Sequence, residues 1–477
     1  MGFSKTCAFA TLGCKVNQYD TEALIALFRK HGYEVVDFDS KADVYCINTC
    51  TVTSTSDHKS RQLIRRARRR NPDAIIVVTG CYPQVSPEEV ASIPGVNVVT
   101  GTHGRSRIID LVEEAKEKKD GAIVAVEPVS SRGEFEETPV EALTRRARAY
   151  VKIQEGCDQF CAYCRVPFAR GPVRSRKPED VISEVERLLL AGYREIVLTG
   201  IHLGLYGADL AGADRARAGG EGTRPDGVSS LAEITRRLLD IGGEWRLRLS
   251  SIEPMDITGE LISTIASSPR AARHLHIPLQ SGDPDILRLM GRPYSPDDYA
   301  RLVEDIRRTI PGCAITTDVM VGFPQETDER FERSYRFVEG IGFSRLHVFR
   351  FSRRPGTRAF YLSGQVDART SARRSRAMVA LGDKLSLAFH EGMTGKDFVV
   401  LFEESHPGGI PGDRQRSCKD PGCSPAGHGH LSGGCMAEGL TDTYVRTYVA
   451  GDGELVGSFR RVRITGAASR YVVGRLD

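Results

Sequence analysis

Apolar segments that alternate with amphipathic ones are the feature of this sequence that most restricts its fold. Between residues 145 and 385, each strand candidate is followed by a helical pattern. The candidates are Tyr150–Gln154, Glu195–Thr199, Arg246–Ser250, His274–Pro278, Ile315–Val321 and Arg345–Phe351. Alternation of this kind is typical of parallel strands joined by helices. The segment therefore predicts an α/β fold, with a central partial barrel of six βα units.

Residues 1–130 repeat this alternation, and three of their apolar runs lead to a cysteine. The cysteines are Cys14, Cys50 and Cys81. Because the carboxyl ends of parallel strands share one edge of a sheet, the three thiols are predicted to converge there. From the residues alone, they are either ligands of one site or buried structural cysteines.

The last part, residues 390–477, consists of short strand patterns that predict a small β-barrel. An insertion at 404–438 is rich in Gly and Pro and carries six metal-ligand residues: His406, Cys418, Cys423, His428, His430 and Cys435. Their spacing is compatible with zinc, but the composition favours a loop with incidental ligands.

The motif Cys157-x3-Cys161-x2-Cys164 follows directly after the first strand of the predicted barrel, on the face where such barrels carry their active sites. Three thiolates suit three irons of a [4Fe–4S] cluster and leave the fourth iron open. A structural zinc site would normally be a closed set of four ligands. We therefore interpret the motif as an open iron–sulfur site.

This motif and several separated segments resemble the methylthiotransferase branch of the radical S-adenosylmethionine (SAM) enzymes. The segments are Thr11–Gln18, Asn48–Cys50, Thr79–Cys81, Gly156–Cys164 with Pro167–Gly171, His276–Gly282 and Asp318–Pro324. The resemblance extends over nearly the whole chain. It implies two [4Fe–4S] clusters and SAM as cofactors, and a C-terminal barrel of the RNA-binding TRAM type.

The resemblance also assigns roles to residues. Cys157, Cys161 and Cys164 would hold the cluster whose open iron chelates SAM, with Tyr163 beside the SAM adenine. Cys14, Cys50 and Cys81 would hold an auxiliary cluster. Seven further residues lie at or near strand ends, where they either contact SAM or cap helices and hold loops: Thr199, Gly200, Ser250, Ser251, Glu253, Gln280 and Asp318.

Three subfamilies share this architecture, and Lys15-Val16-Asn17 after Cys14 looks most like the one that acts on threonylcarbamoyladenosine. In that group a first SAM methylates a sulfur at the auxiliary cluster. A second SAM yields the radical that activates C2 of the adenosine at tRNA position 37. The alternatives are isopentenyladenosine in tRNA, an aspartate of a ribosomal protein, and a non-catalytic RNA-binding redox sensor. Arg170, Arg174 and Arg176 are candidate cations for the threonylcarbamoyl carboxylate.

Two basic segments suit a tRNA anticodon stem-loop as partner. Seven cations and no acid fall within Lys59–Arg70, which is either a phosphate-binding helix or a solvated face. Five arginines, Arg460, Arg461, Arg463, Arg470 and Arg475, lie near the C-terminus. A low-potential electron donor such as flavodoxin or ferredoxin is the further expected partner.

The chain has a formal net charge of +4, which permits a nucleic-acid partner without requiring one. No apolar run reaches the roughly 18 residues of a membrane helix, and residues 1–10 lack the pattern of a secretory signal. A cytoplasmic location and no membrane partner are therefore expected. In such a chain, twelve cysteines indicate metal or catalytic chemistry rather than disulfides.

Overall fold

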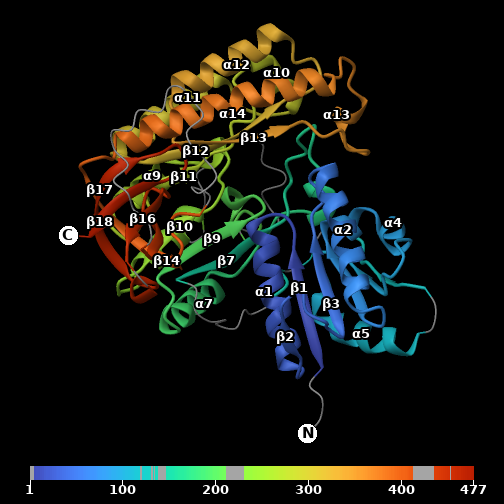
Figure 1. The fold of residues 1–477 in the computed structure, drawn as a ribbon. Coiled ribbons are helices and arrows are strands. Elements are labelled where there is room, and N and C mark those ends of the chain that lie inside the picture. Colours follow the sequence, from blue (N-terminus) through green and yellow to red (C-terminus); the bar gives the residue numbers. More distant parts are fainter. Residues whose placement is uncertain are drawn as a thin grey trace.

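The computed structural model describes residues 5–118, 121–129, 133, 135–137, 147–210, 230–411, 434–451 and 453–476. An N-terminal sheet with its helices (blue) and the C-terminal strands (red) lie on opposite sides of a central α/β part (Figure 1). None of the helices in these ranges combines the length and apolarity that crossing a bilayer requires.

The N-terminal sheet is parallel throughout, with the strand order β2-β1-β3-β4-β5-β6. Its strands are β1 (Thr6–Thr11), β2 (Glu34–Val36), β3 (Val44–Thr49), β4 (Ile75–Gly80), β5 (Val98–Thr100) and β6 (Ile123–Ala125). Its helices are α1 (Lys15–Lys30), α2 (Ser54–Arg70), α3 (Cys81–Val85), α4 (Pro87–Ala91), η1 (Arg105–Arg107) and α5 (Ile108–Glu117). Every residue of β3 and β4 is buried, which explains their continuous apolar sequences.

The central part contains the six predicted parallel strands in chain order. They are β7 (Arg148–Glu155), β9 (Glu195–Gly200), β10 (Arg246–Leu249), β11 (His274–His276), β12 (Ala314–Val321) and β13 (Arg345–Arg350). Single bridges from Leu247 to Ala271 and from Ser251 to His276 join the two halves between β10 and β11. A short strand, β8 (Arg174–Ser175), pairs antiparallel with the end of β7. The predicted partial barrel is confirmed.

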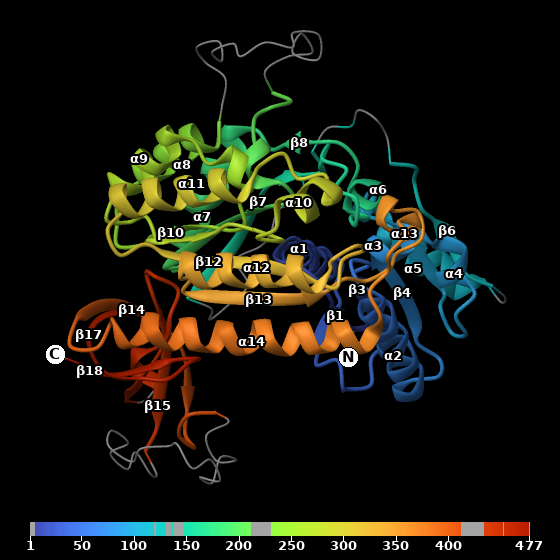
Figure 2. The same ribbon diagram turned by 90° about the horizontal axis from the view of Figure 1, so that it is seen from above.

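Helices accompany these strands because their apolar faces must be buried. Val181, Val185 and Leu188 of α7 recur at helical spacing and join one core with Val151 and Ile153 of β7. The elements are α6 (Val166–Arg170), α7 (Pro178–Leu190), η2 (Leu203–Leu205), α8 (Leu231–Leu239), η4 (Pro254–Asp256), α9 (Gly259–Ala266), α10 (Pro284–Met290), α11 (Pro296–Thr309), α12 (Asp328–Ile341), α13 (Arg358–Tyr361) and α14 (Ala368–Glu391). The long helix α14 runs along β13 and leads to the C-terminal strands (Figure 2).

The C-terminal strands form a closed barrel in the order β14-β15-β16-β18-β17, which confirms the predicted small β-barrel. They are β14 (Asp397–His406), β15 (Met436–Thr441), β16 (Arg446–Ala450), β17 (Phe459–Ala467) and β18 (Val472–Leu476), with η6 (Gly453–Leu455) before β17.

The predicted insertion at 404–438 is shorter than expected. His406 pairs with Met436, so β14 and β15 continue into it from both ends. Met436 and Ala437 are buried in the barrel, which makes them part of its core rather than of a loop. Four of the candidate zinc ligands, Cys418, Cys423, His428 and His430, lie outside the described residues.

Candidate active site

Cys14, Cys50 and Cys81 lie at the carboxyl ends of three adjacent strands. Cys14 is the N-cap of α1 after β1, Cys50 follows β3, and Cys81 is the first residue of α3 directly after β4. The order β1-β3-β4 in the sheet brings their loops together, as the strand-end argument predicts. Burial raises the pKa of Cys50 to about 12, and the neighbouring thiols of Cys81 and Cys14 add to this rise.

Two local features hold the Cys14 loop against the Cys50 loop. Gly13 has φ +113°, and a Cβ at this position would lie only 2.9 Å from Cys50 Cβ, so glycine permits the close approach. The Asn17 side-chain amide donates to the carbonyl oxygens of Leu12 at 2.7 Å and Thr49 at 3.1 Å. The two loops are thus fixed relative to each other.

Cys157, Cys161 and Cys164 lie in the loop between β7 and α6. Burial raises the pKa of Cys164 to about 12, and Cys161 and Cys157 are close enough to raise it further. Backbone N–H groups donate to two of the sulfurs, from Gln159 to Cys157 Sγ at 3.4 Å and from Val166 to Cys164 Sγ at 3.3 Å. Such N–H···S contacts stabilise thiolates as cluster ligands.

Two residues that the sequence analysis missed, His202 and Arg292, contact sulfur atoms of this triplet. His202 Nδ1 lies 3.3 Å from Cys157 Sγ, while its Nε2 lies 2.6 Å from Asp256 Oδ2. Burial opposes the charge on this imidazole, but the hydrogen bonds to Asp256 and Cys157 raise the pKa of His202 to about 10. Arg292 Nη1 donates to Cys161 Sγ at 3.4 Å.

Of the residues predicted to contact SAM, Tyr163 lies beside the triplet, and Thr199 and Gly200 lie at a strand end. Tyr163 is half-buried between Cys161 and Cys164 and packs on an apolar cluster that includes Ala162. Thr199 and Gly200 end β9, next to β7. Their roles toward SAM remain predictions.

The remaining predicted SAM contacts follow β10, β11 and β12. Ser250 and Ser251 come directly after β10, and Ser251 bridges to His276 of β11. Glu253 forms an ion pair with Arg292, so its carboxylate orients the arginine that contacts Cys161.

Gln280 and Asp318 meet at the next strand pair. Gln280 has φ +65°, and its backbone N–H donates to Asp318 O at 2.8 Å. The Asp318 carboxylate lies between His276 Nε2 at 3.2 Å and His347 Nδ1 at 3.3 Å. Asp318 is half-buried, and desolvation would raise its pKa, but these two imidazoles hold the pKa below the usual range.

Both cysteine triplets fit a cluster better than a single metal ion. In the described part of the chain, the groups whose ligand atoms all lie within 4.8 Å are found elsewhere, at His276–Asp318–His347 and Glu404–His406–Glu438. The thiols of each triplet are therefore spaced too widely for one ion. The ten cysteines that the structure describes are all free. Three separated thiolates without a fourth are the ligand set of a [4Fe–4S] cluster with one open iron.

Comparison with known proteins agrees with this chemistry. Residues 6–101 match the model of the uncharacterized protein family UPF0004, and residues 151–338 match the radical SAM superfamily. The chain is 41% identical over 470 residues to the threonylcarbamoyladenosine tRNA methylthiotransferase MtaB of Bacillus subtilis, covering 98% of this chain and 96% of that protein. It is 34% identical to the tRNA-2-methylthio-N(6)-dimethylallyladenosine synthase of Carboxydothermus hydrogenoformans, covering 84% and 88% of the two chains.

A solved structure shares the fold. The radical S-adenosylmethionine methyltransferase TsrM of Kitasatospora setae, with cobalamin and a [4Fe–4S] cluster bound, superposes with a TM-score of 0.53 at 18% identity, covering 75% of this chain and 77% of that one. The full-length match to MtaB and the match to the radical SAM superfamily show the family and its cofactors, SAM and [4Fe–4S] clusters. The chain belongs to the radical SAM methylthiotransferases, in their MtaB branch.

Proposed function

We propose that this protein attaches a methylthio group to C2 of N6-threonylcarbamoyladenosine beside the anticodon of tRNA, at position 37. The observation that carries the proposal is that the chain matches MtaB over 98% of its length and has two separate cysteine triplets. Within each triplet, the thiols lie close together. The lower identity to the dimethylallyladenosine synthase favours the threonylcarbamoyl substrate over the apolar one.

Each of the two cysteine triplets would hold a different cluster. Cys157, Cys161 and Cys164 would hold the cluster at the barrel face, and Cys14, Cys50 and Cys81 the auxiliary cluster. When bound, SAM and the clusters supply the radical and the methylthio sulfur. The protein's own residues hold the thiolates in place: His202 contacts Cys157, and Arg292 contacts Cys161. We further infer that a low-potential donor such as flavodoxin or ferredoxin supplies the electron.

The threonylcarbamoyl group carries a carboxylate, for which a buried cation without an acidic partner is the matching receptor. Two of the three candidate arginines are already engaged. Arg170 pairs with Asp20 and Glu155, and Arg176 pairs with Glu137 and Glu184.

Arg174 differs from these two arginines. Its guanidinium donates to Arg170 O at 2.9 Å and lies 3.3 Å from His103 Nε2. No carboxylate in the described ranges forms an ion pair with it, and burial lowers its pKa. However, its two contacts are with Arg170, the last residue of α6, and with His103 of the N-terminal part. In the chain it does not adjoin any of the predicted cluster ligands.

Lys15 fits the receptor role better because it directly follows Cys14. Among the described residues, its ammonium has no ion pair, and it lies 5.9 Å from the ring centroid of Tyr444. Burial lowers the pKa of Lys15, and the nearby guanidinium groups of Arg248 and Arg148 lower it too. An arriving carboxylate would relieve this repulsion. In adenine, ring atom N1 lies between C2 and C6, and C6 carries the N6 substituent. A receptor for that substituent beside Cys14 therefore suits attack at C2.

Tyr444 brings the C-terminal barrel into this cationic group. Its ring also lies under Arg248 at 4.6 Å and Arg148 at 5.8 Å from the guanidinium carbons. Burial raises the pKa of this phenol, but Lys15, Arg148 and Arg248 together lower it. The two arginines pair with Glu195 and Glu403, which leaves Lys15 as the cation for an incoming anion.

Helix α2 offers a surface for the tRNA backbone, although fewer of its cations are available than the sequence predicts. Arg61 pairs with Glu89, Arg66 and Arg70 pair with Asp39, and Arg68 donates to backbone carbonyls. Within the described ranges, Lys59, Arg65 and Arg69 form no ion pair and are exposed. We propose that these three contact phosphates.

Charge reversal at Arg65 and Arg69 should weaken tRNA binding and reduce its salt dependence. Each lost phosphate contact lowers the slope of log K against log salt by about 0.7 to 0.9. Filter binding of tRNA between low and moderate salt measures this slope. The matched control reverses Arg301 and Arg308 on α11, which pair with their own neighbours Asp298 and Asp305. Equal slopes for both variants would indicate that α2 is a solvent-exposed face that does not contact tRNA phosphates.

The nucleosides of cells that lack the protein test the proposed function. We expect the methylthio-threonylcarbamoyl nucleoside to disappear and its unthiolated precursor to accumulate, as measured by mass spectrometry of digested tRNA. Disappearance of the methylthio-isopentenyl nucleoside instead would assign the protein to the sister branch. An unchanged nucleoside profile would refute a role in tRNA methylthiolation.

A further inference from the structure

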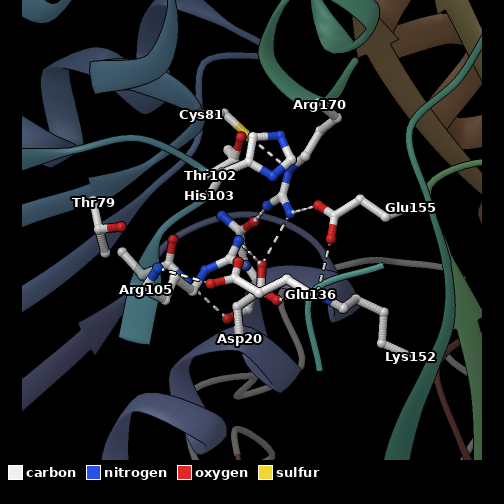
Figure 3. A network of polar contacts seen from close by, with 12 residues as sticks. Asp20, Thr79, Cys81, Thr102, His103, Arg105, Glu136, Lys152, Glu155 and Arg170 are labelled. Atoms are coloured by element: carbon white, nitrogen blue, oxygen red, sulfur yellow. Dashed lines mark hydrogen bonds and ion pairs between the residues drawn. The ribbon is translucent and has the colours of Figure 1, made fainter. Parts of the chain in front are cut away.

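A buried network of charged side chains joins the N-terminal part to the central barrel (Figure 3). Asp20 of α1 is its centre: Asp20 Oδ2 accepts from Arg170 at 2.9 Å and from Arg105 at 2.8 Å, and Asp20 Oδ1 accepts from Lys152 at 2.7 Å. Lys152 also donates to Glu155 Oε2 at 2.9 Å. Burial alone would raise the pKa of Asp20, but Arg105, Lys152 and Arg170 lower it, so the carboxylate is charged.

Arg170 is the member of this network that reaches a cysteine of the auxiliary set. Its Nη1 donates to Asp20 and Glu155, and its Nη2 donates to Asn17 Oδ1. Its Nε donates to Cys81 Sγ at 3.3 Å. Because every nitrogen of the guanidinium has an acceptor and the side chain is fully buried, the direction of the Nε–H toward sulfur is fixed.

The position of Arg170 in the chain links this contact to the other cysteine triplet. Helix α6 begins at Val166, whose N–H donates to Cys164 Sγ, and ends at Arg170. Helix α6 also packs against α3, which begins with Cys81. One short helix thus contacts a sulfur of the first triplet at its start and a sulfur of the second at its end.

We propose that Arg170 is a positioning residue for the auxiliary cluster: its Nε–H holds the Cys81 sulfur in place and raises the reduction potential of the cluster. The inference rests on the assignment of Cys14, Cys50 and Cys81 as ligands in the proposed function. Reduction adds negative charge to a cluster, and a cation that donates a hydrogen bond to a ligand sulfur stabilises that charge. Burial strengthens the effect because little water screens it.

Arg105 provides a matched control. It is also fully buried and bonds the same Asp20 oxygen, but its other partner is Glu136, and no contact with a cysteine is found among the described residues. Arg105→Gln therefore removes a cation from the same network without removing the N–H···S contact, whereas Arg170→Gln removes both.

The test is a redox titration of the full-length chain carrying Cys157→Ala, Cys161→Ala and Cys164→Ala, in which the auxiliary cluster is the one remaining. With electron paramagnetic resonance as readout, Arg170→Gln should lower the ratio of reduced to oxidised cluster about tenfold at a fixed potential, which corresponds to 59 mV for one electron. Arg105→Gln should change the ratio by less than about twofold.

Equal shifts in the two variants, or no shift in Arg170→Gln with full iron content, would overturn the proposal. If Arg170→Gln loses its cluster while Arg105→Gln keeps it, the role in holding Cys81 is supported. Loss of the cluster from both variants would instead indicate a structural network and overturn it. If the background chain itself bound no cluster, the ligand assignment would be wrong rather than the role of Arg170.

Discussion

Replacing Cys157, Cys161 and Cys164 together by alanine is expected to abolish reductive cleavage of SAM to 5′-deoxyadenosine. The three thiols are mutual neighbours, and each accepts a hydrogen bond or contacts a charged side chain. Without them the open iron that would chelate SAM cannot be held. Anaerobic reconstitution followed by iron and sulfide counting and by chromatography of the products measures both consequences. About half of the iron should remain, since the auxiliary set is intact.

The matched triple variant at Cys14, Cys50 and Cys81 should fail differently. It should also keep about half of the iron, but it should retain some SAM cleavage while losing methylthio transfer. This difference follows from the separate positions of the two sets, one at the N-terminal sheet edge and one in the β7–α6 loop. Identical products from the two variants, or full iron in either, would contradict the division of labour.

The parallel architecture explains why so much of the candidate site could be predicted from sequence. Cys14, Cys50 and Cys81 are far apart along the chain, but each follows an apolar run. Parallel strands place such positions at one edge regardless of sequence separation. The six barrel strands were predictable for the same reason, because their apolar runs are bounded by helical patterns.

The contacts that orient the thiols could not be predicted. Arg170 and Cys81 are 89 positions apart, and Arg292 and Cys161 are 131 apart, so no local pattern records either contact. His202 carried a weak signal, because it lies two residues beyond the end of β9. The pairing of two candidate cations was equally hidden. Arg170 and Arg176 form ion pairs with acids that are distant in sequence or lie in other elements, namely Asp20, Glu155, Glu137 and Glu184.

Strand β15 was missed for a different reason. Its residues, Met436–Thr441, include Ala, Glu and Gly, which have low strand propensity. They also adjoin a segment rich in Gly, Pro, Cys and His, so the local composition predicts a loop. Pairing with β14 on one side and β16 on the other decides the structure, and this pairing is a tertiary effect.

Lys15→Met is expected to lower kcat/KM for threonylcarbamoyl tRNA about 100-fold, because removing one partner of a desolvated charge pair costs about 2 to 5 kcal/mol. The clusters and SAM cleavage should be unaffected, since the Lys15 ammonium lies over the Tyr444 ring and, among the described residues, no contact between it and a cysteine sulfur is found. Lys30→Met is the matched control on the same helix, at its exposed C-terminal end. Lys15→Arg should restore part of the activity because it restores the charge.

Binding to two anticodon stem-loops separates a carboxylate receptor from a phosphate contact. One loop carries threonylcarbamoyladenosine and the other unmodified adenosine, and fluorescence anisotropy gives both dissociation constants. The wild-type protein should prefer the modified loop, and Lys15→Met should lose this preference with little change for the unmodified loop. Equal weakening for both loops would place Lys15 on a phosphate. A wild-type protein without any preference would instead count against the threonylcarbamoyl substrate itself, because a half-buried cation that has no ion pair among the described residues should bind the carboxylate of the modified loop.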